Sequence, residues 1–407
     1  MHPLSLPVLV AALGYFVDIY DIVIFGVTRG PSLKDLGIAP DQVNAVGQMI
    51  FNGQMVGMLL GGVLWGVLGD RVGRIQALWG CIILYSLANL ACAGLGHYGT
   101  WMPVEQQYLW LRFIAGVGLA GELGAAITLV SELVDPRRRG WATALVAGIG
   151  VSGAVAAVGI SKLTDWRTAY VVGGILGFAL LLLRVRILES GIFAHSVQSH
   201  VRRGSLVMLF ASADRWRRLL ACILIGVPTW FVVGSLVFFS NKLAAAKGVA
   251  EPVDPAFAIM WCYIGLIVGD LGSGAASQLL RSRRLAIGLF LALTTVLVGV
   301  ACLAPLPVTG YYVLAACLGV AVGYWAVFVS VAAEQFGTNL RATVATIVPN
   351  VARGLVWPIS LATTALTPSL GHPHATLAIG AICLALAFLG VWLLRETWGT
   401  DLDWQEA

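Results

Sequence analysis

The stretch Gly69-Asp70-Arg71-Val72-Gly73-Arg74 places one acid and two arginines between two long apolar runs. Charges are scarce elsewhere, since 59% of the 407 residues are hydrophobic and only 11% are charged, whereas soluble domains carry about a quarter charged residues. We therefore predict that this stretch is a polar loop between two membrane-spanning helices.

Apolar runs of about 20 residues, long enough to cross a hydrocarbon core of about 30 Å, recur along the whole chain. They predict an all-α membrane protein with twelve spans. The first run contains Asp18 and Asp21 and has no basic residue before it, so we interpret it as a mature helix and not as a signal peptide. The predicted spans lie near residues 8–29, 42–69, 76–96, 107–134, 141–164, 169–188, 218–241, 256–280, 286–305, 310–337, 342–368 and 374–395.

Basic residues are concentrated in alternate loops between the spans. With a cytoplasmic N-terminus, most arginines fall in inner loops, and the positive-inside rule then predicts that both termini are cytoplasmic. Because these arginines are scattered over short loops and form no single patch, they do not indicate a nucleic-acid partner. The inner loops would hold Arg71, Arg74, the triplet Arg137 to Arg139, Arg283, Arg284 and Arg341, among others.

The longest polar stretch between spans divides the chain into two groups of six spans. We predict a first six-helix bundle over residues 1–188, a cytoplasmic linker over 189–217 and a second bundle over 218–407. Parallel repeats of six helices, with the substrate site between them near the midplane, are a known transporter design.

A short repeat supports this division. In the first half Glu132 precedes Arg139 by seven residues, and in the second half Glu334 precedes Arg341 by the same spacing. An Ala-Thr pair follows each arginine, at equivalent loops of the two halves.

Four stretches resemble the major facilitator superfamily and, within it, the metabolite:proton symporters of organic acids and zwitterions. The resemblance implies two six-helix bundles that work by alternating access, and a loop at residues 69–74 that latches the halves on the inner side. Together with the absence of any Asn-X-Ser/Thr sequon, it indicates a bacterial inner membrane and a monomer. The four stretches are Asp18 to Asp21, Gly69 to Arg74, Arg112 to Glu122, and Trp166-Arg167 with Leu183 to Ser190.

Two departures from the family pattern shape the expectation. The second-half counterpart of the loop, Gln278 to Arg284, keeps the basic residues and lacks the aspartate and glycines, which predicts an asymmetric latch. The segment Gly148 to Gly153 lacks the proline of many exporters, which favours uptake.

That segment and Gly116 to Gly121 both have the pattern G-x-G-x-x-G, but neither follows a strand, so we interpret both as helix-packing glycines and not as a dinucleotide site.

Six charged residues fall inside the predicted spans, where a charge at the bilayer centre costs roughly 2.5 to 3.5 kcal/mol on insertion scales. Such residues face the protein interior and usually have a function. From a rise of 1.5 Å per residue we expect them to share one layer near the midplane, with Arg112 nearer the outer side. They are Asp18, Asp21, Arg112, Glu122, Asp270 and Arg353.

Proton coupling is the chemistry expected of this layer, because an unpaired buried carboxylate takes up a proton. We expect Asp21 to be the coupling acid, followed by Glu122 and then Asp18, with Arg112 as their partner. The alternative is a static ion pair of Asp21 or Glu122 with Arg112. No cofactor is expected, and the proton would be the coupling ion.

Arg353 is the expected substrate ligand, since a guanidinium binds a carboxylate through two parallel hydrogen bonds. Asn350, Arg353 and Trp357 are spaced i, i+3 and i+7 and should form one stripe, with the indole packing on the substrate. The alternative is a permanent salt bridge from Arg353 to Asp270 or to an acid of the first span. Further candidate contacts, most of which also suit packing or helix-helix hydrogen bonding, are Asp270, Tyr324, Trp325, Gln48 and Asn52.

The sequence therefore predicts a secondary active carrier that takes up a small organic acid or zwitterion with a proton. Its partners would be a small-molecule substrate and the lipid bilayer. A carrier or exporter of a cationic solute is the alternative in the same fold, because the layer is net acidic. A membrane enzyme or a non-transporting sensor is less well supported, since no nucleophile-base set and no large domain outside the membrane is evident.

Overall fold

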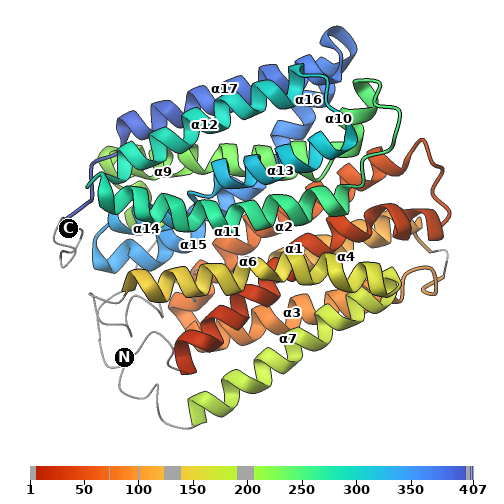
Figure 1. Ribbon diagram of the computed structural model, residues 1–407. Helices are drawn as coiled ribbons and strands as arrows, with labels where there is room; N and C mark the ends of the chain where they lie inside the picture. The colour runs from red at the N-terminus through yellow and green to blue at the C-terminus, as the bar shows by residue number, and fades with distance from the viewer. Residues whose placement is uncertain are drawn as a thin grey trace.

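The computed structural model describes residues 6–72, 74–99, 101–122, 139–189, 206–399, 404 and 406, and the regular structure within them is helical (Figure 1). In the first half the helices are α1 (Leu6–Asp35), α2 (Val43–Val72), α3 (Arg74–Ala93), α4 (Val104–Leu119), α6 (Arg139–Leu163) and α7 (Trp166–Glu189). In the second half they are α8 (Leu206–Phe210), α9 (Ala213–Phe231), the π-helix η1 (Val232–Val237), α10 (Ser240–Ala246), α11 (Pro255–Leu279), α12 (Arg283–Leu303), α13 (Val308–Val322), α14 (Trp325–Glu334), α15 (Thr338–Gly354), α16 (Val356–Leu370) and α17 (His372–Leu393).

Ten stretches of the described chain are long and apolar enough to cross a membrane. Helices α4 and α6 lie at the places of the fourth and fifth predicted spans, so the described helices follow the order of the predicted spans and the prediction of an all-α membrane protein is confirmed. Large apolar side chains point outward from the long helices, as expected of surfaces that face lipid. Val296 of α12 is 64% exposed and Trp392 of α17 is 72% exposed.

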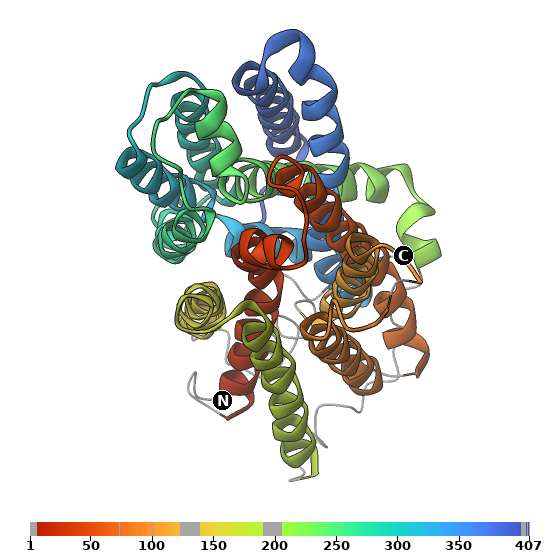
Figure 2. The ribbon, with the colours of Figure 1, turned by 90° about the vertical axis from the view of Figure 1, so that its right-hand side faces the viewer.

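The helices of the two halves form two bundles, visible end-on in Figure 2 as the red to yellow-green group and the green to blue group. In the first bundle α1 packs along α6 and α2 along α4, and in the second α11 packs along α13 and α9 along α17. The start of α1 and the end of α17 lie at the same end of the molecule, and α10 lies at the opposite end (Figure 1).

Glycines set the closest helix contacts. A Cβ on Gly116 of α4 would overlap the carbonyl oxygen of Gln54 on α2, and one on Gly153 of α6 would overlap that of Phe16 on α1. Both G-x-G-x-x-G segments therefore serve close helix packing.

Side-chain caps explain where several helices begin. Asp254 accepts a hydrogen bond from the Ala256 N–H at 2.9 Å at the start of α11, and Ser282 accepts one from the Leu285 N–H at 3.1 Å at the start of α12. Each cap satisfies a backbone donor that has no partner within the helix.

Three predicted spans of the second half are interrupted. The span predicted at 218–241 passes from α9 into η1, the span at 310–337 divides into α13 and α14, and the span at 342–368 divides into α15 and α16. Near the last division Pro358 has no N–H to donate back to the carbonyl of Gly354. Each of these stretches is still one candidate span, Ala213–Val237, Val308–Glu334 and Thr343–Leu370, with an interruption inside it that the sequence did not predict.

The charged stretch that separates the second and third spans consists mostly of helix ends. Gly69, Asp70 and Arg71 lie in the last turn of α2, and Arg74 begins α3, so a long loop is not present there. Gly73 lies outside the described residues, as do Glu132 and most of the predicted linker. Helix α9 begins at Ala213, four residues before the predicted end of that linker at 217.

Candidate functional site

All six predicted interior charges are buried, which confirms their inward placement. Five have no exposed surface and Asp270 is 7% exposed. The structure divides them into separate interactions rather than one network, with Asp18 near Arg353, Asp21 near Arg112, and Glu122 and Asp270 each bound elsewhere.

Arg353 of α15 lies beside two indole rings. Its guanidinium carbon is 5.4 Å from the ring centre of Trp230 and 5.7 Å from that of Trp325, within the range of cation-π attraction. The two indoles are 6.2 Å apart, with their planes inclined at 73°. Trp230 lies at the end of α9 next to η1, and Trp325 is the first residue of α14, so the interrupted helices meet around this arginine.

The guanidinium of Arg353 keeps one edge available. Its Nη1 donates to Oδ1 of Asn350 at 3.3 Å, while Nε and Nη2 have no hydrogen-bond acceptor among the residues that the structure describes. Asp18 of α1 forms an ion pair with this edge, its Oδ2 3.9 Å from Nη2 and so without a hydrogen bond, as the alternative of a salt bridge to an acid of the first span predicts. Nε and Nη2 together form the edge through which arginine binds a carboxylate in the bidentate manner.

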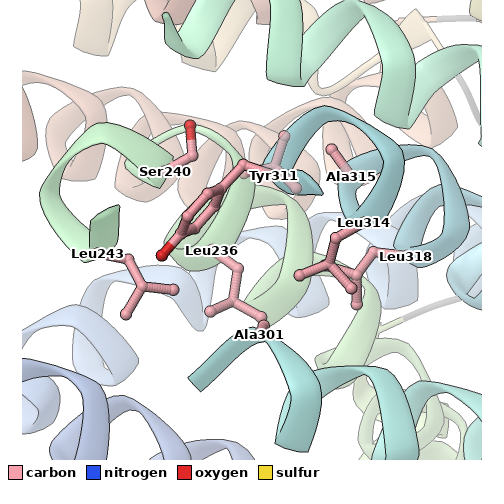
Figure 3. Close-up of a pocket in the computed structure, with 9 residues that line it drawn as sticks. Leu236, Ser240, Leu243, Ala301, Tyr311, Leu314, Ala315 and Leu318 are labelled. Carbon is pink, nitrogen blue, oxygen red and sulfur yellow. The ribbon is translucent and has the colours of Figure 1, made fainter. Parts of the chain in front are cut away.

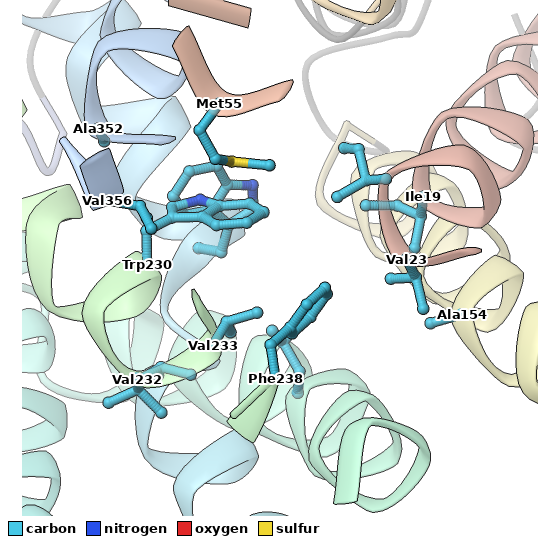
Figure 4. Close-up of a cluster of buried hydrophobic side chains, with 14 of the residues drawn as sticks. Ile19, Val23, Met55, Ala154, Trp230, Val232, Val233, Phe238, Ala352 and Val356 are labelled. Atoms are coloured by element: carbon cyan, nitrogen blue, oxygen red, sulfur yellow. The ribbon is translucent and has the colours of Figure 1, made fainter. Parts of the chain in front are cut away.

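The apolar surroundings of this site come from both bundles. Figure 4 shows Trp230 beside Met55 of α2, with Ala352 and Val356 next to it. Across from them lie Ile19 and Val23 of α1 and Ala154 of α6.

Asn350 contributes to the site, whereas Trp357 is not one of the indoles over Arg353. The Asn350 amide donates to the carbonyls of Ala120 on α4 at 2.8 Å and of Thr346 at 2.9 Å, so it joins the two bundles while orienting Arg353. Trp357 is 47% exposed and is not one of the two indoles that lie over Arg353, so its role in substrate packing stays a prediction. Helices α15 and α16 meet at Leu355, whose backbone stays in the right-handed helical region.

Asp270 of α11 is bound to the backbone instead of to Arg353. Its Oδ1 accepts a hydrogen bond from the Ala326 N–H at 2.9 Å, at the N-terminus of α14, where a negative charge is favoured. The alternative of an Arg353–Asp270 salt bridge is therefore wrong, and the nearer acid is Asp18.

Among the weaker candidates, Trp325 lies at the site and the others make helix contacts. The Tyr324 hydroxyl donates to the carbonyl of Ile225 at 2.8 Å. Asn52 exchanges hydrogen bonds with Ser360 of α16 at 2.8 and 3.0 Å and accepts one from Gln48 at 3.2 Å.

Arg112 of α4 lies close to Asp21 but does not bind its carboxylate. It donates to Oδ1 of Asn89 at 2.8 Å, to Oε1 of Gln54 at 3.3 Å and to the backbone carbonyl of Asp21 at 2.7 Å. Neither carboxylate oxygen of Asp21 has a hydrogen-bond donor within the described part of the chain. A static Asp21–Arg112 pair, one of the sequence alternatives, is absent from these residues.

Glu122 pairs with an arginine that the sequence did not single out. Its Oε2 accepts from Nη1 of Arg184 on α7 at 3.1 Å, and a second bond joins Nη2 to Oε1. The sequence placed Arg184 at an inner helix end and gave no signal of this pairing. Trp230 was missed for the same reason, since nothing local distinguishes it from other apolar residues of its span.

A small apolar hollow lies in the second bundle, away from Arg353. It has a volume of about 20 Å³, and Figure 3 shows Tyr311, Leu236, Leu243 and Leu314 around it. Such a volume holds about one water molecule, so this hollow is no site for a metabolite.

Comparison with known proteins shows the family. The model of the Major Facilitator Superfamily matches residues 11–361. The chain belongs to this superfamily. It is therefore a multi-pass membrane protein from a family of transporters, not of enzymes.

Relatives within the superfamily are similar over most or part of the chain. The Gentisate transporter of Corynebacterium glutamicum is 25% identical over 93% of this chain and 85% of its own length. The 3-(3-hydroxy-phenyl)propionate transporter of Escherichia coli is 31% identical over 62% of each chain. Other curated relatives are matched over only 43% and 44% of their length.

A solved structure of the proton:xylose symporter XylE, bound to 6-bromo-6-deoxy-D-glucose, has the same fold. It superimposes with a TM-score of 0.70, covers 98% of this chain and 97% of its own, and is 16% identical in sequence. At this identity the likeness concerns the fold alone.

Proposed function

We propose that this transporter takes up a small aromatic carboxylate together with a proton, and that Arg353 binds the carboxylate. The buried Nε and Nη2 edge of Arg353 is the observation that carries the proposal, because a desolvated donor edge without an acceptor among the described residues suits a bidentate anion. Leaving such donors unpaired costs about 1 to 3 kcal/mol, which substrate binding would recover.

The aromatic part of the proposal rests on Trp230 and Trp325. Their inclined rings on the same guanidinium offer faces and edges to a planar substrate ring, an arrangement worth about 0.5 to 1.5 kcal/mol per aromatic pair. Gentisate and 3-(3-hydroxyphenyl)propionate, named for two relatives, are both aromatic carboxylates.

Proton coupling is assigned to Asp21, with Asp18, Glu122 and Arg112 in supporting roles. Asp21 is fully buried and its carboxylate lacks a donor in the described chain, so it can exist uncharged without losing a hydrogen bond. Asp18 lies 3.9 Å from Arg353 and would respond when a substrate carboxylate arrives at that arginine.

Transport would proceed by rocking of a bundle over residues 1–188 against one over 218–407, joined by a linker over 189–217. We place the protein as a monomer in the bacterial inner membrane with both termini in the cytoplasm. The loop of Gly69, Asp70, Arg71, Gly73 and Arg74 would latch the inner side.

A carrier of a cationic solute is the second candidate. Asp18 and Asp21 are two buried carboxylates without hydrogen-bond donors among the described residues, a feature that also suits an organic cation. The single arginine edge is more specific, because it requires an anion of a defined geometry.

Uptake by proteoliposomes separates the two candidates. We expect labelled gentisate or benzoate to accumulate when the outside is acidic and to stop accumulating when a protonophore is added, and labelled choline to be excluded. Asp21→Asn should abolish the gradient-driven accumulation while gentisate exchange continues. Accumulation that is indifferent to the protonophore would contradict proton symport, and choline uptake would favour the second candidate.

A further inference from the structure

A group of unpaired polar side chains lies inside the first bundle, away from Arg353. The Tyr85 hydroxyl, Ser86 Oγ and Asn89 Nδ2 of α3 and both carboxylate oxygens of Asp21 are buried without a hydrogen-bond partner in the described parts of the chain. Native structures pair the large majority of buried side-chain polar atoms, so their concentration on four neighbouring residues needs an explanation.

Two glycines of α7 show that these groups form a continuous row. A Cβ on Gly173 would lie 2.6 Å from Oδ1 of Asp21 and 3.4 Å from Nδ2 of Asn89. One helical turn later, a Cβ on Gly177 would lie 2.8 Å from the Tyr85 ring and would overlap Oγ of Ser86. The missing side chain of Gly173 leaves space for Asp21 and Asn89. The missing side chain of Gly177, one turn further along α7, leaves space for Ser86 and Tyr85.

The row leads toward the Glu122–Arg184 ion pair. Gly14 of α1 lies against both Glu122 and Arg184, and it precedes Asp21 by seven residues, about 10 Å along a helix. Along α7, Gly177 at the Tyr85 ring lies between Gly173 at Asp21 and Arg184 of the ion pair. The ionisable groups that face this row are Asp18 and Asp21 from α1, Cys81 from α3, Arg112 from α4, Glu122 just after α4, and Arg184 from α7.

We propose that the hydroxyl of Tyr85 relays protons between Asp21 and the Glu122–Arg184 pair. In the outward step of the relay, protonated Asp21 gives its proton to the Tyr85 oxygen, directly or through a bound water. The hydroxyl releases its own proton to the Glu122 carboxylate, so that Tyr85 ends with one proton as before. Glu122 becomes neutral, separates from Arg184, passes the proton to water and re-forms the ion pair.

This route keeps the proton and the substrate apart. The Arg184 side chain is 12% exposed, so the ion pair has contact with the surroundings of the bundle, whereas Arg353 and Asp18 have no exposed surface. The inference rests on the proposed function at one point, because it takes Asp21 as the coupling acid. It does not depend on which substrate is transported.

Infrared difference spectroscopy of the full-length protein without substrate tests the relay. After a jump to acidic pH, the carboxyl band that is missing in Asp21→Asn reports protonation of Asp21. We expect Tyr85→Phe to slow the appearance of this band by at least about tenfold and to leave its final amplitude unchanged. The substitution removes no hydrogen bond made within the described chain, so folding should persist.

Tyr20→Phe is the matched control. Tyr20 precedes Asp21 and is also fully buried, but its hydroxyl donates to the carbonyl of Ala169 at 2.8 Å and is not part of the row. The control should protonate at the wild-type rate. An unchanged rate in Tyr85→Phe, an equal slowing in Tyr20→Phe, or no titrating Asp21 band would each overturn the relay. Failure of gentisate uptake would bear on the proposed function alone, because no substrate enters this measurement.

Discussion

Arg353 shows at the scale of one residue why shape matters beyond charge. Its environment supplies two indole faces, one amide oxygen and one carboxylate at ion-pair distance, and it leaves a planar donor edge without a hydrogen bond. A lysine would keep the charge but present a single point donor without the fork.

We therefore expect Arg353→Lys to weaken gentisate binding about 10- to 100-fold, the equivalent of about 1.5 to 3 kcal/mol for a lost charge-assisted contact. Isothermal titration of the purified protein measures this change in Kd. Trp357→Phe is the control, because Trp357 lies on the exposed surface and its variant should bind as wild type. Unchanged affinity in Arg353→Lys would remove this residue as the carboxylate ligand.

Helix interruptions are the main feature at the scale of elements. The junctions after α9, α13 and α15 all lie near Trp230, Trp325 and Arg353, and discontinuous helices of this kind line binding sites in other transporters. Hydropathy alone could not reveal them, because an apolar window stays apolar across a turn. Asp270 shows the consequence, since only the break before α14 exposes the backbone N–H that it binds.

The junction between α13 and α14 depends on a close approach to α11. A Cβ on Gly323 would lie 2.5 Å from Cα of Gly269 and 2.7 Å from the backbone nitrogen of Asp270, atoms that cannot move aside without shifting a helix. We expect Gly323→Ala to destabilise the protein by about 1 to 3 kcal/mol through this overlap, seen as a lower midpoint of thermal unfolding. Gly288→Ala, in open space on α12, should be no less stable than wild type. Equal midpoints for the two variants would show that the approach is not constrained.

The segment after α17 anchors the start of α12 through Glu396. Burial alone would raise the pKa of Glu396, but hydrogen bonds from Ser282 and from the backbone N–H groups of Trp398, Arg283 and Arg284 outweigh it and hold the pKa below its ordinary value. A lowered pKa means that the folded state binds the proton more weakly. The resulting stabilisation is present above the ordinary value of about 4.5 and is lost as the pH falls through the lowered pKa.

Glu396→Gln should therefore lower the unfolding midpoint at pH 7, by an amount typical of a lost helix cap, about 1 kcal/mol. The difference from wild type should shrink as the pH falls below about 4.5. Thermal unfolding followed at several pH values measures both effects. A difference that stays constant between pH 7 and the acidic range would show that the charge of Glu396 is not the source.

At the scale of the whole molecule, the apolar run lengths and the long polar stretch in the middle of the chain sufficed to predict the membrane spans, their order and their grouping into two bundles. Buried charges were also predictable, because each lies deep within a long apolar run. The partners of these charges could not be predicted, because tertiary packing determines which groups meet. Glu122 binds Arg184 from another helix, and Arg112 binds a backbone carbonyl.

The two bundles meet at the end of the molecule that carries α10, and Asn241 is central to this contact. It accepts a hydrogen bond from Arg29 of α1 at 3.2 Å and donates one to Asn44 of α2 at 3.1 Å. Close by in the same interface, Phe51 of α2 packs on Phe238, with ring centres 4.9 Å apart. These contacts hold that end closed in this conformation.

Asn241→Ala removes two hydrogen bonds, each worth about 1 kcal/mol, and should shift the equilibrium roughly 5- to 30-fold toward a conformation in which this end is open. Distances between spin labels at Asp41 and Glu251, one on each bundle, would report the longer separation, in a Cys317→Ser background because Cys317 is the exposed cysteine of the described chain. Ser330→Ala, which removes a hydrogen bond within α14 only, should leave the distances unchanged. If the Asn241→Ala distances match those of wild type, the closure of this end depends on apolar packing such as that of Phe51, and not on Asn241.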